Sequence, residues 1–228
     1  MHPLDNVIWQ ALTTRQAQFA ESFGGARRFV REVGPLGAFS EADDEGYAAL
    51  AGLVEAGGTV GLFLDAAYEA RAGWDFVAGA PLLQMICENS IVPHAVGKPA
   101  PPIQELGPND SAEMIALTAL TKPGPFSTRT HELGAYVGIR DGGKLVAMAG
   151  ERLKVPGHTE VSAVCTHPDH TGNGYAAILM AKVMRRIRER GETPFLHSRQ
   201  DNVRAIEVYK RLGFRERKLG HFAVLRME

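Results

Sequence analysis

The sequence has little of what marks several large classes of protein. Its only cysteines are Cys87 and Cys165, each inside an apolar stretch, so we expect buried, reduced thiols and no metal site. No apolar run approaches the roughly 18 residues that a membrane-spanning helix needs. The first residues, from Met1 to Asn6, lack the basic start and apolar core of a secretory signal. These absences predict a cytoplasmic protein that needs no metal and has no membrane partner.

An excess of charge of either sign is also missing. The 228 residues carry a formal net charge of −1, whereas proteins that mainly bind nucleic acid usually carry a clear positive charge. We therefore expect no nucleic-acid partner. The hydrophobic content of 45% and charged content of 22% are typical of a globular protein. We expect a monomer or a homodimer, with one large domain or two small ones.

Prolines and glycines divide the chain. A proline-rich segment at 93–102 has few periodic apolar positions, which predicts a linker. Before it, residues 1–92 predict a small α/β domain with a helix near 43–56 and a buried strand at 59–64. After it, residues 103–228 predict strand, helix, a three-strand antiparallel meander, and then helix, strand, helix and strand. The last strand of the meander and the strand that follows it flank a crossover helix and should be parallel.

The loop before the helix that begins near Ala176 carries the clearest local signal. An apolar run from Val161 to Thr166 predicts a buried strand, and Gly172 and Gly174 follow it in a turn. Glycine permits the left-handed backbone that such a loop needs. A strand, a glycine-containing loop and a helix N-terminus make an anion site, because free N–H groups and the helix dipole converge on one point. Such a site suits a pyrophosphate.

This loop, with its flanking stretches, resembles the GNAT superfamily, the GCN5-related N-acetyltransferases, and in particular the branch with an FR47-like C-terminal domain. The stretches that carry the resemblance are Val164-Cys165-Thr166-His167-Pro168-Asp169-His170, Thr171-Gly172-Asn173-Gly174-Tyr175-Ala176 and Asn202-x-x-Ala205-x-x-x-Tyr209-x-x-x-Gly213-Phe214. The resemblance covers about 103–228. It implies an α/β (α+β) fold with a mixed, mostly antiparallel sheet, a splayed pair of parallel strands and flanking helices. For residues 1–92, a degenerate half of the same fold is the alternative to an unrelated domain.

The resemblance also implies a reaction. Acetyl-CoA, as co-substrate, would give its acetyl group to a primary amine of a small molecule or peptide, by direct transfer in a ternary complex. The implied cofactor-binding residues are Val164, Cys165, Thr166, Thr171, Gly172, Asn173, Gly174, Tyr175, Ala176, Ala177 and Asn202. The family usually has Arg or Gln where this chain has Thr171, so one long donor is missing and weaker cofactor affinity is expected.

Catalytic roles follow from the same resemblance. Tyr209 would be the general acid that protonates the departing thiolate, and Asn202, seven residues earlier, shares its helix face. Glu160, at the start of a strand, would be the general base that deprotonates the amine. Other candidates for the base are Glu151, His158 and His197. Residues implied at the acceptor site, in the loop before the meander, are Arg129, His131 and Glu132.

Two other functions compete with acetyl transfer. A non-catalytic acyl-CoA-binding or regulatory module is suggested by Thr171 and opposed by Tyr209 and Asn202. A Rossmann-type nucleotide-binding domain is disfavoured, because the loop lacks the first glycine of the dinucleotide fingerprint. An antiparallel meander is also wrong for a doubly wound sheet.

Overall fold

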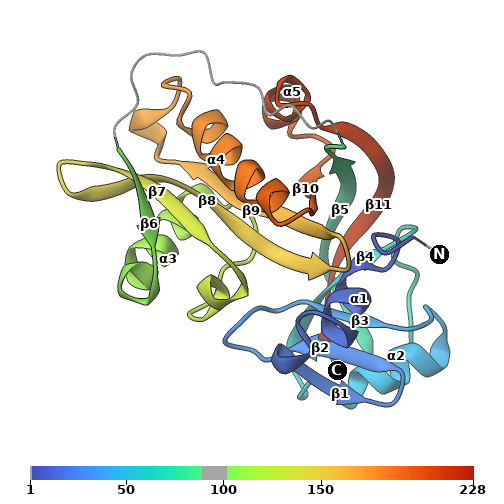
Figure 1. The fold of residues 1–228 in the computed structure, drawn as a ribbon. Coiled ribbons are helices and arrows are strands. Elements are labelled where there is room, and N and C mark those ends of the chain that lie inside the picture. The colour runs from blue at the N-terminus through green and yellow to red at the C-terminus, as the bar shows by residue number, and fades with distance from the viewer. Residues whose placement is uncertain (1, 89–101) are drawn as a thin grey trace.

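The computed structural model describes residues 2–88 and 102–228, and an eight-stranded sheet forms its centre (Figure 1). The order of the strands is β4-β11-β5-β10-β9-β8-β7-β6. Their bounds are β4 (Thr59–Leu64), β5 (Trp74–Ile86), β6 (Ile103–Leu106), β7 (Tyr136–Asp141), β8 (Lys144–Val155), β9 (His158–Thr166), β10 (Thr193–Arg199) and β11 (Arg215–Met227). Only β9 and β10 pair in parallel, as predicted, and the other neighbours are antiparallel. The fold is therefore the expected mixed, mostly antiparallel α/β arrangement.

Helices cover both faces of this sheet. Those of the later part are α3 (Ser111–Thr121), α4 (Tyr175–Glu189) and α5 (Val203–Arg211). Tyr136 of β7 packs in one cluster with Met114 of α3, while its neighbour Val137 packs in another with Leu179 of α4. Successive side chains of a strand point to opposite faces, so α3 and α4 lie on opposite faces. Ile206 of α5 belongs to the same cluster as Leu179 and Val137, here called the α4 cluster. This places α5 on the face of the sheet that α4 covers.

The N-terminal part does not form a domain apart from this sheet. Its elements before β4 are α1 (Val7–Thr13), β1 (Ala20–Phe23), β2 (Ala26–Phe29), β3 (Gly37–Phe39) and α2 (Asp44–Ala51). β1, β2 and β3 make a small separate sheet, but β4 and β5 belong to the main one, and β5 pairs with both β10 and β11. The predicted division between 1–92 and 103–228 therefore does not hold for these two strands. The difference arises because β4 and β5 pair with strands far along the chain, and such long-range pairing leaves no mark in a local sequence pattern.

Two further expectations concern this part of the chain. The predicted linker at 93–102 lies outside the described residues, apart from its last position. The proposal that residues 1–92 are a degenerate half of the fold stays a prediction. The predicted helix near 43–56 is confirmed as the shorter α2, where the side chain of Asp43 accepts a hydrogen bond from the N–H of Gly46 at 2.8 Å.

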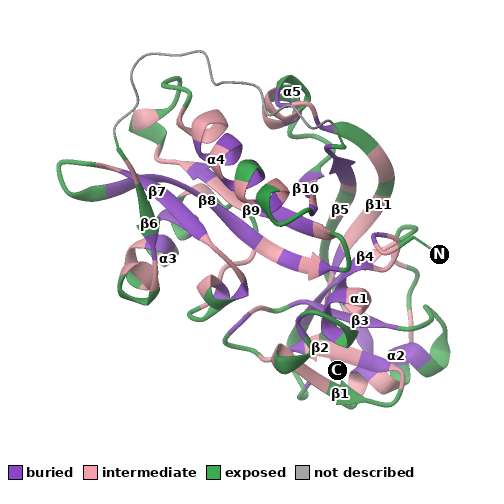
Figure 2. Ribbon diagram, viewed as in Figure 1, coloured by how far each residue is buried: buried purple, intermediate pink, exposed green. Residues whose placement is uncertain are grey.

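Burial follows the coverage by helices (Figure 2). β7 and β8 are buried on both faces over most of their length, because α3 and α4 cover them. The first half of β5, around Phe76 and Val77, is exposed. Tyr136 lies directly over Gly150, where an added Cβ would come within 2.2 Å of the ring. This close packing fixes the centre of the sheet beside the parallel strands.

Candidate active site

β9 and β10 begin as a parallel pair and then part. The paired residues are Thr193 with His158, Pro194 with Thr159 and Phe195 with Glu160. Beyond them β9 continues to Thr166 and β10 to Arg199, and the described residues show no further pairing between the two strands. Their facing edges can therefore accept an extended ligand arm as an added strand. The predicted cofactor residues Val164, Cys165 and Thr166 lie on the parted part of β9.

A bulge distorts β9 in the same segment. The opposed residues on either side of it are Met148 with Cys165 and Gly150 with Ser162. Ala163 and Val164 thus face a single residue of β8, and Ala163 has a φ of 52°, which residues with a Cβ rarely adopt. Such backbone strain persists where the surrounding structure imposes it, often at functional sites. A bulge frees backbone N–H groups from the ladder, and one of these can polarise a carbonyl beside β9.

The loop before α4 has the predicted form. Gly172 and Gly174 have φ values of 84° and 76°, and a Cβ on either would meet nothing within 4 Å. Within the described ranges, the backbone N–H groups from Gly172 to Ala177 have no acceptor, and the first helical bond runs from the N–H of Ile178 to the carbonyl of Gly174 at 3.2 Å. Unbonded N–H groups at the start of a long helix form an anion site. The predicted residues Asn173, Tyr175 and Ala176 belong to this row.

Side chains of the loop fold back on it. The hydroxyl of Thr171 donates to the carbonyl of Pro168 at 3.0 Å, and the amide of Asn173 donates to the carbonyl of His170, also at 3.0 Å. The ring of His170 lies 3.0 Å from the carboxylate of Asp141. The hydroxyl of Thr171 is therefore bonded within the loop, which stiffens it, and does not reach outward. An Arg or Gln side chain at this position would be long enough to reach outward. The loop and the parted edge together offer N–H groups for an anion and a strand edge for an extended arm.

α5 brings Tyr209 against the α4 cluster. Its ring centroid lies 6.3 Å from that of Phe214. Burial raises the pKa of Tyr209 to about 12, so the phenol is protonated at neutral pH. Asn202 caps the same helix, because its side-chain oxygen accepts from the N–H of Ala205 at 3.4 Å. The structure thus places both residues on one short helix, and their contacts with a cofactor stay predictions.

Glu160 lies in a buried network. Its two oxygens accept from Nε and Nη2 of Arg152 at 2.8 and 2.7 Å, and the N–H of Leu153 is 3.3 Å away. Nδ1 of His197 lies 2.7 Å from Oε1. Burial by itself would raise the pKa of Glu160, but the charge and hydrogen bonds of Arg152, with those of His197, outweigh it and lower the pKa to about 2. A carboxylate so stabilised takes up protons poorly, and these contacts speak against its expected role as the base.

The other candidates for the base lie in different surroundings. Glu151 is buried between Arg190 at 2.9 Å and Lys154 at 3.0 Å. His158 lies at the start of β9, where its Nδ1 is 3.0 Å from a turn carbonyl. Only His197 joins Glu160 at the parting of the strands. Sequence reasoning named His197 as one candidate among several and missed its partners, which come from other strands.

The predicted acceptor loop docks on the N-terminal part of the chain. The hydroxyl of Thr130 donates to the carbonyl of Val33 at 2.6 Å. Arg129 and Glu132 are exposed and pair with each other through two bonds of 2.7 and 2.8 Å. Among the described residues, Nδ1 of His131 is buried without a partner. The loop also lines a narrow cavity that reaches the buried Arg152, which brings it near Glu160.

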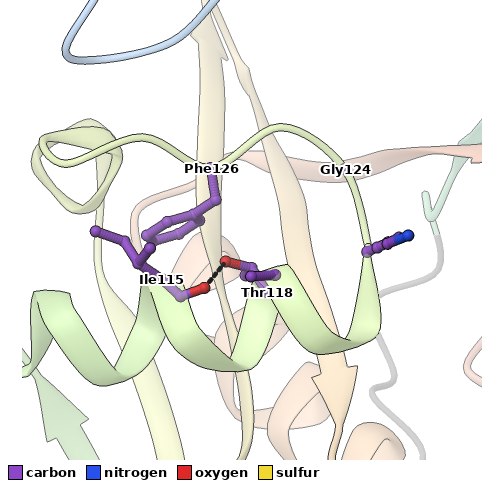
Figure 3. A pocket seen from close by; sticks show the side chains of 6 residues that line it. Ile115, Thr118, Gly124 and Phe126 are labelled. Carbon is purple, nitrogen blue, oxygen red and sulfur yellow. Dashed lines mark hydrogen bonds between the residues drawn. The ribbon is translucent and has the colours of Figure 1, made fainter.

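A larger cavity of about 230 Å³ lies between α3 and the start of the same loop (Figure 3). The residues that line it are Ile115, Thr118, Ala119, Lys122, Gly124 and Phe126. The ring of Phe126 lies beside Ile115 on one side of it. The hydroxyl of Thr118 donates to the carbonyl of Ile115 at 2.9 Å and is thus bonded within its own helix. The lining is mostly apolar and suits an apolar group.

The cysteines and acidic groups add no further chemistry at this site. Cys87 and Cys165 are buried thiols, as predicted, and burial raises the pKa of Cys165 to about 11, which keeps it protonated. Across residues 2–88 and 102–228, no group of three or more His, Cys, Asp or Glu side chains could hold a metal ion. No described helix has both the length and the apolar character to cross a membrane.

Known proteins share this fold, and the fold supports acyl transfer. Residues 136–223 match the FR47-like protein family. A crystal structure from Novosphingobium aromaticivorans, described as an acetyltransferase of the GNAT family, is 37% identical over 100% of both chains with a TM-score of 0.91. A GCN5-related N-acetyltransferase from Kribbella flavida, 19% identical over 98% of this chain and 96% of its own, has a TM-score of 0.61 and shares the fold. No curated protein matches the chain. The chain belongs to the GNAT family of acetyltransferases.

Proposed function

We propose that the protein transfers the acetyl group of acetyl-CoA to a primary amine of a small molecule or a peptide, directly within a ternary complex. The observation that carries this proposal is the parting of β9 and β10 beside the unbonded N–H row from Gly172 to Ala177. Unpaired backbone groups cost free energy when they are buried, so a parted strand pair is rarely kept without a ligand to fill it. An extended arm that ends in a pyrophosphate satisfies both the edge and the row.

Each part of the site has a task in this reaction. Acetyl-CoA supplies the acetyl group as a thioester. The N–H groups from Gly172 to Ala177 bind its pyrophosphate, and the edge of β9 from Val164 to Thr166 pairs with the pantetheine arm. Asn202 contacts the cofactor from the start of α5. Tyr209, protonated at neutral pH, donates its proton to the departing thiolate.

The acceptor approaches from the face of the sheet opposite α4. Residues that line its path in this proposal are Arg129, His131 and Glu132. The neighbouring cavity beside Phe126 is apolar, which favours an acceptor whose amine is attached to an apolar group. We further propose that the protein works in the cytoplasm as a monomer or homodimer.

A thiol-release assay with acetyl-CoA tests the proposal over a panel of amines, amino acids and peptide N-termini. We expect thiol release with at least one class of amine. Tyr209→Phe should bind CoA with unchanged affinity but lose transfer by about a hundredfold, the lower range for a general acid. Tyr47→Phe, which changes a buried phenol on α2, is the matched control and should keep full transfer. Normal transfer by Tyr209→Phe would remove the acid role.

The second candidate is a non-catalytic acyl-CoA-binding or regulatory module. The observation in its favour is Thr171, whose hydroxyl bonds back to Pro168 and leaves the loop without a long donor. Binding of acetyl-CoA by calorimetry, together with no thiol release over the whole panel, is the result that would favour this module over the enzyme.

A further inference from the structure

A row of hydrogen-bonded side chains crosses the sheet where β9 and β10 part. It runs from Arg152 on β8 through Glu160 on β9 and His197 on β10 to Gln84 on β5 and Arg217 on β11. Val161, next to Glu160 on β9, and Leu196, next to His197 on β10, both pack in the α4 cluster, so the row lies on the opposite face. The side chain of His197 is only 5% exposed and lies between the last backbone pair and the open part of the strands.

The donors in this row fix where the proton of His197 lies. Arginine can only donate, so Oε1 of Gln84 must accept from Nη1 of Arg217 at 2.7 Å. The amide nitrogen of Gln84 then faces Nε2 of His197 at 3.1 Å and also donates to the carbonyl of Leu4 at 3.0 Å. Nε2 must therefore accept, and Nδ1 carries the proton and donates it to Glu160 at 2.7 Å. Nδ1 of His197 thus faces the carboxylate as a donor, while Nε2, the acceptor, points away from it.

We propose that His197 is the general base for the acceptor amine and that Glu160 positions it. The amide nitrogen of Gln84 is hydrogen-bonded to Nε2 until an acceptor amine replaces it there. This inference rests on the proposed function and assigns the base of that same site. Alongside Gln84, His197 lines a small cavity whose other walls include Phe63, Asp65 and Lys218.

The charged groups around His197 are mostly paired with one another. On one side are Glu160 and Arg152, paired with each other, and on the other is Arg217, paired with Asp5 at 2.5 Å. Further titratable groups that face the cavity are Asp65, Lys218 and His221. Asp65 and Lys218 form an ion pair of 2.6 Å.

The proton and electron pairs balance as follows. Nε2 of His197 takes one proton from the acceptor ammonium, and the amine lone pair forms the bond to the acetyl carbon. The carbon–sulfur bond breaks with its electron pair on sulfur, which takes the proton of Tyr209. The second proton lost by the nitrogen leaves to solvent, and solvent exchange returns His197 and Tyr209 to their starting states.

Kinetics over a range of pH test the base. His197→Gln should lower kcat/KM by about a hundredfold and abolish the fall in rate on the acid side, while CoA affinity measured by calorimetry stays unchanged. The matched control is His158→Gln, which should keep both the rate and the pH profile. Gln84→Glu adds a second carboxylate at Nε2, stabilises the imidazolium and should move the acid limb to higher pH. Wild-type rate and acid limb in folded His197→Gln would overturn the inference.

Nitrogen NMR of the imidazoles tests the same assignment without turnover. In the free full-length protein, His197, identified by its loss in His197→Gln, should show the tautomer protonated at Nδ1 at neutral pH. The tautomer protonated at Nε2 would overturn the inference. Failure of the proposed function would give a different result: the wild-type protein would release no thiol over the whole panel, while the tautomer of His197 would be the expected one. In that case His197 would have no role as a base.

Discussion

The two faces of the parted strands are built in opposite ways. On the α4 face, the row from Gly172 to Ala177 consists of backbone N–H groups of consecutive residues, largely exposed and unbonded. On the other face, the row from Arg152 to Arg217 consists of side chains from distant strands, largely buried and bonded to one another. Water can bond the first row until a ligand replaces it. The second row is stable only while every member keeps its partner.

This contrast separates binding from stability. Changes in the exposed backbone row should alter cofactor affinity and leave the fold almost intact. Changes in the buried side-chain row should alter the fold and the acceptor chemistry, because one lost partner leaves another charge buried and unpaired.

The largest expected effect is the loss of Glu160. Glu160→Ala leaves the buried guanidinium of Arg152 without its partner and should lower the free energy of unfolding by about 3–5 kcal/mol. Urea unfolding followed by circular dichroism measures the change. Replacing both partners, Arg152→Met with Glu160→Leu, should restore much of the lost stability, because no unpaired charge remains. Equal stability of Glu160→Ala and the wild type would mean that the buried row does not hold the sheet together.

Acid should weaken the same row. The pKa of Glu160 is about 2 in the folded protein against 4.5 ordinarily, so its stabilisation is fully present above about pH 5 and is lost as pH falls toward 2. The difference between these values corresponds to about 3 kcal/mol. Free energies of unfolding measured at pH 6 and pH 3 should therefore differ more in the wild type than in Glu160→Gln. The same pH dependence in both proteins would contradict this source of acid sensitivity.

Two glycines of similar geometry test the exposed row. Gly174 and Gly157 have φ values of 76° and 71°, and neither has an atom within 4 Å of an added Cβ. Alanine at either position should cost about 1 kcal/mol of stability, because a Cβ disfavours the left-handed region. Only Gly174→Ala should also weaken acetyl-CoA binding, measured by calorimetry. Equal affinity of the two variants would place the pyrophosphate elsewhere.

Thr171 offers the smallest expected effect. Thr171→Arg restores a long donor and should tighten acetyl-CoA binding about threefold, as expected for an exposed charge pair of about 0.7 kcal/mol. Thr171→Val removes the hydroxyl that bonds to Pro168 without adding a donor, and it should give no gain in calorimetry. Tighter binding by both variants would show that loop stiffness, rather than the missing donor, limits affinity.

These comparisons also explain what could be predicted from the sequence. The exposed row of N–H groups lies in one contiguous stretch of sequence. Gly172 and Gly174 in that stretch predict the positive φ values that the structure shows. The parallel pairing of β9 and β10 follows from the crossover helix between them. Both signals are local, so a single sequence contains them.

The buried row could not be predicted in the same way. Arg152, Gln84 and Arg217 look like ordinary polar residues of strands, and only the insertion of β5 between β10 and β11 brings them together. The resemblance to the family implies that Glu160, at the start of a strand, is a base. The bulge opposite Glu160, where both Arg152 and Leu153 face it, turns that residue into half of an ion pair.

The place of β5 in the sheet also determines when its partner strands become available during synthesis of the chain. β5 is synthesised early, yet the strands on its two sides, β10 and β11, leave the ribosome only after α4. Until Arg215–Met227 emerges, the nascent chain carries β4 and β5 without their partners, and unpaired strand edges invite association with other chains. The edges that β4 and β5 present to β11 therefore stay open to such association until β11 has emerged.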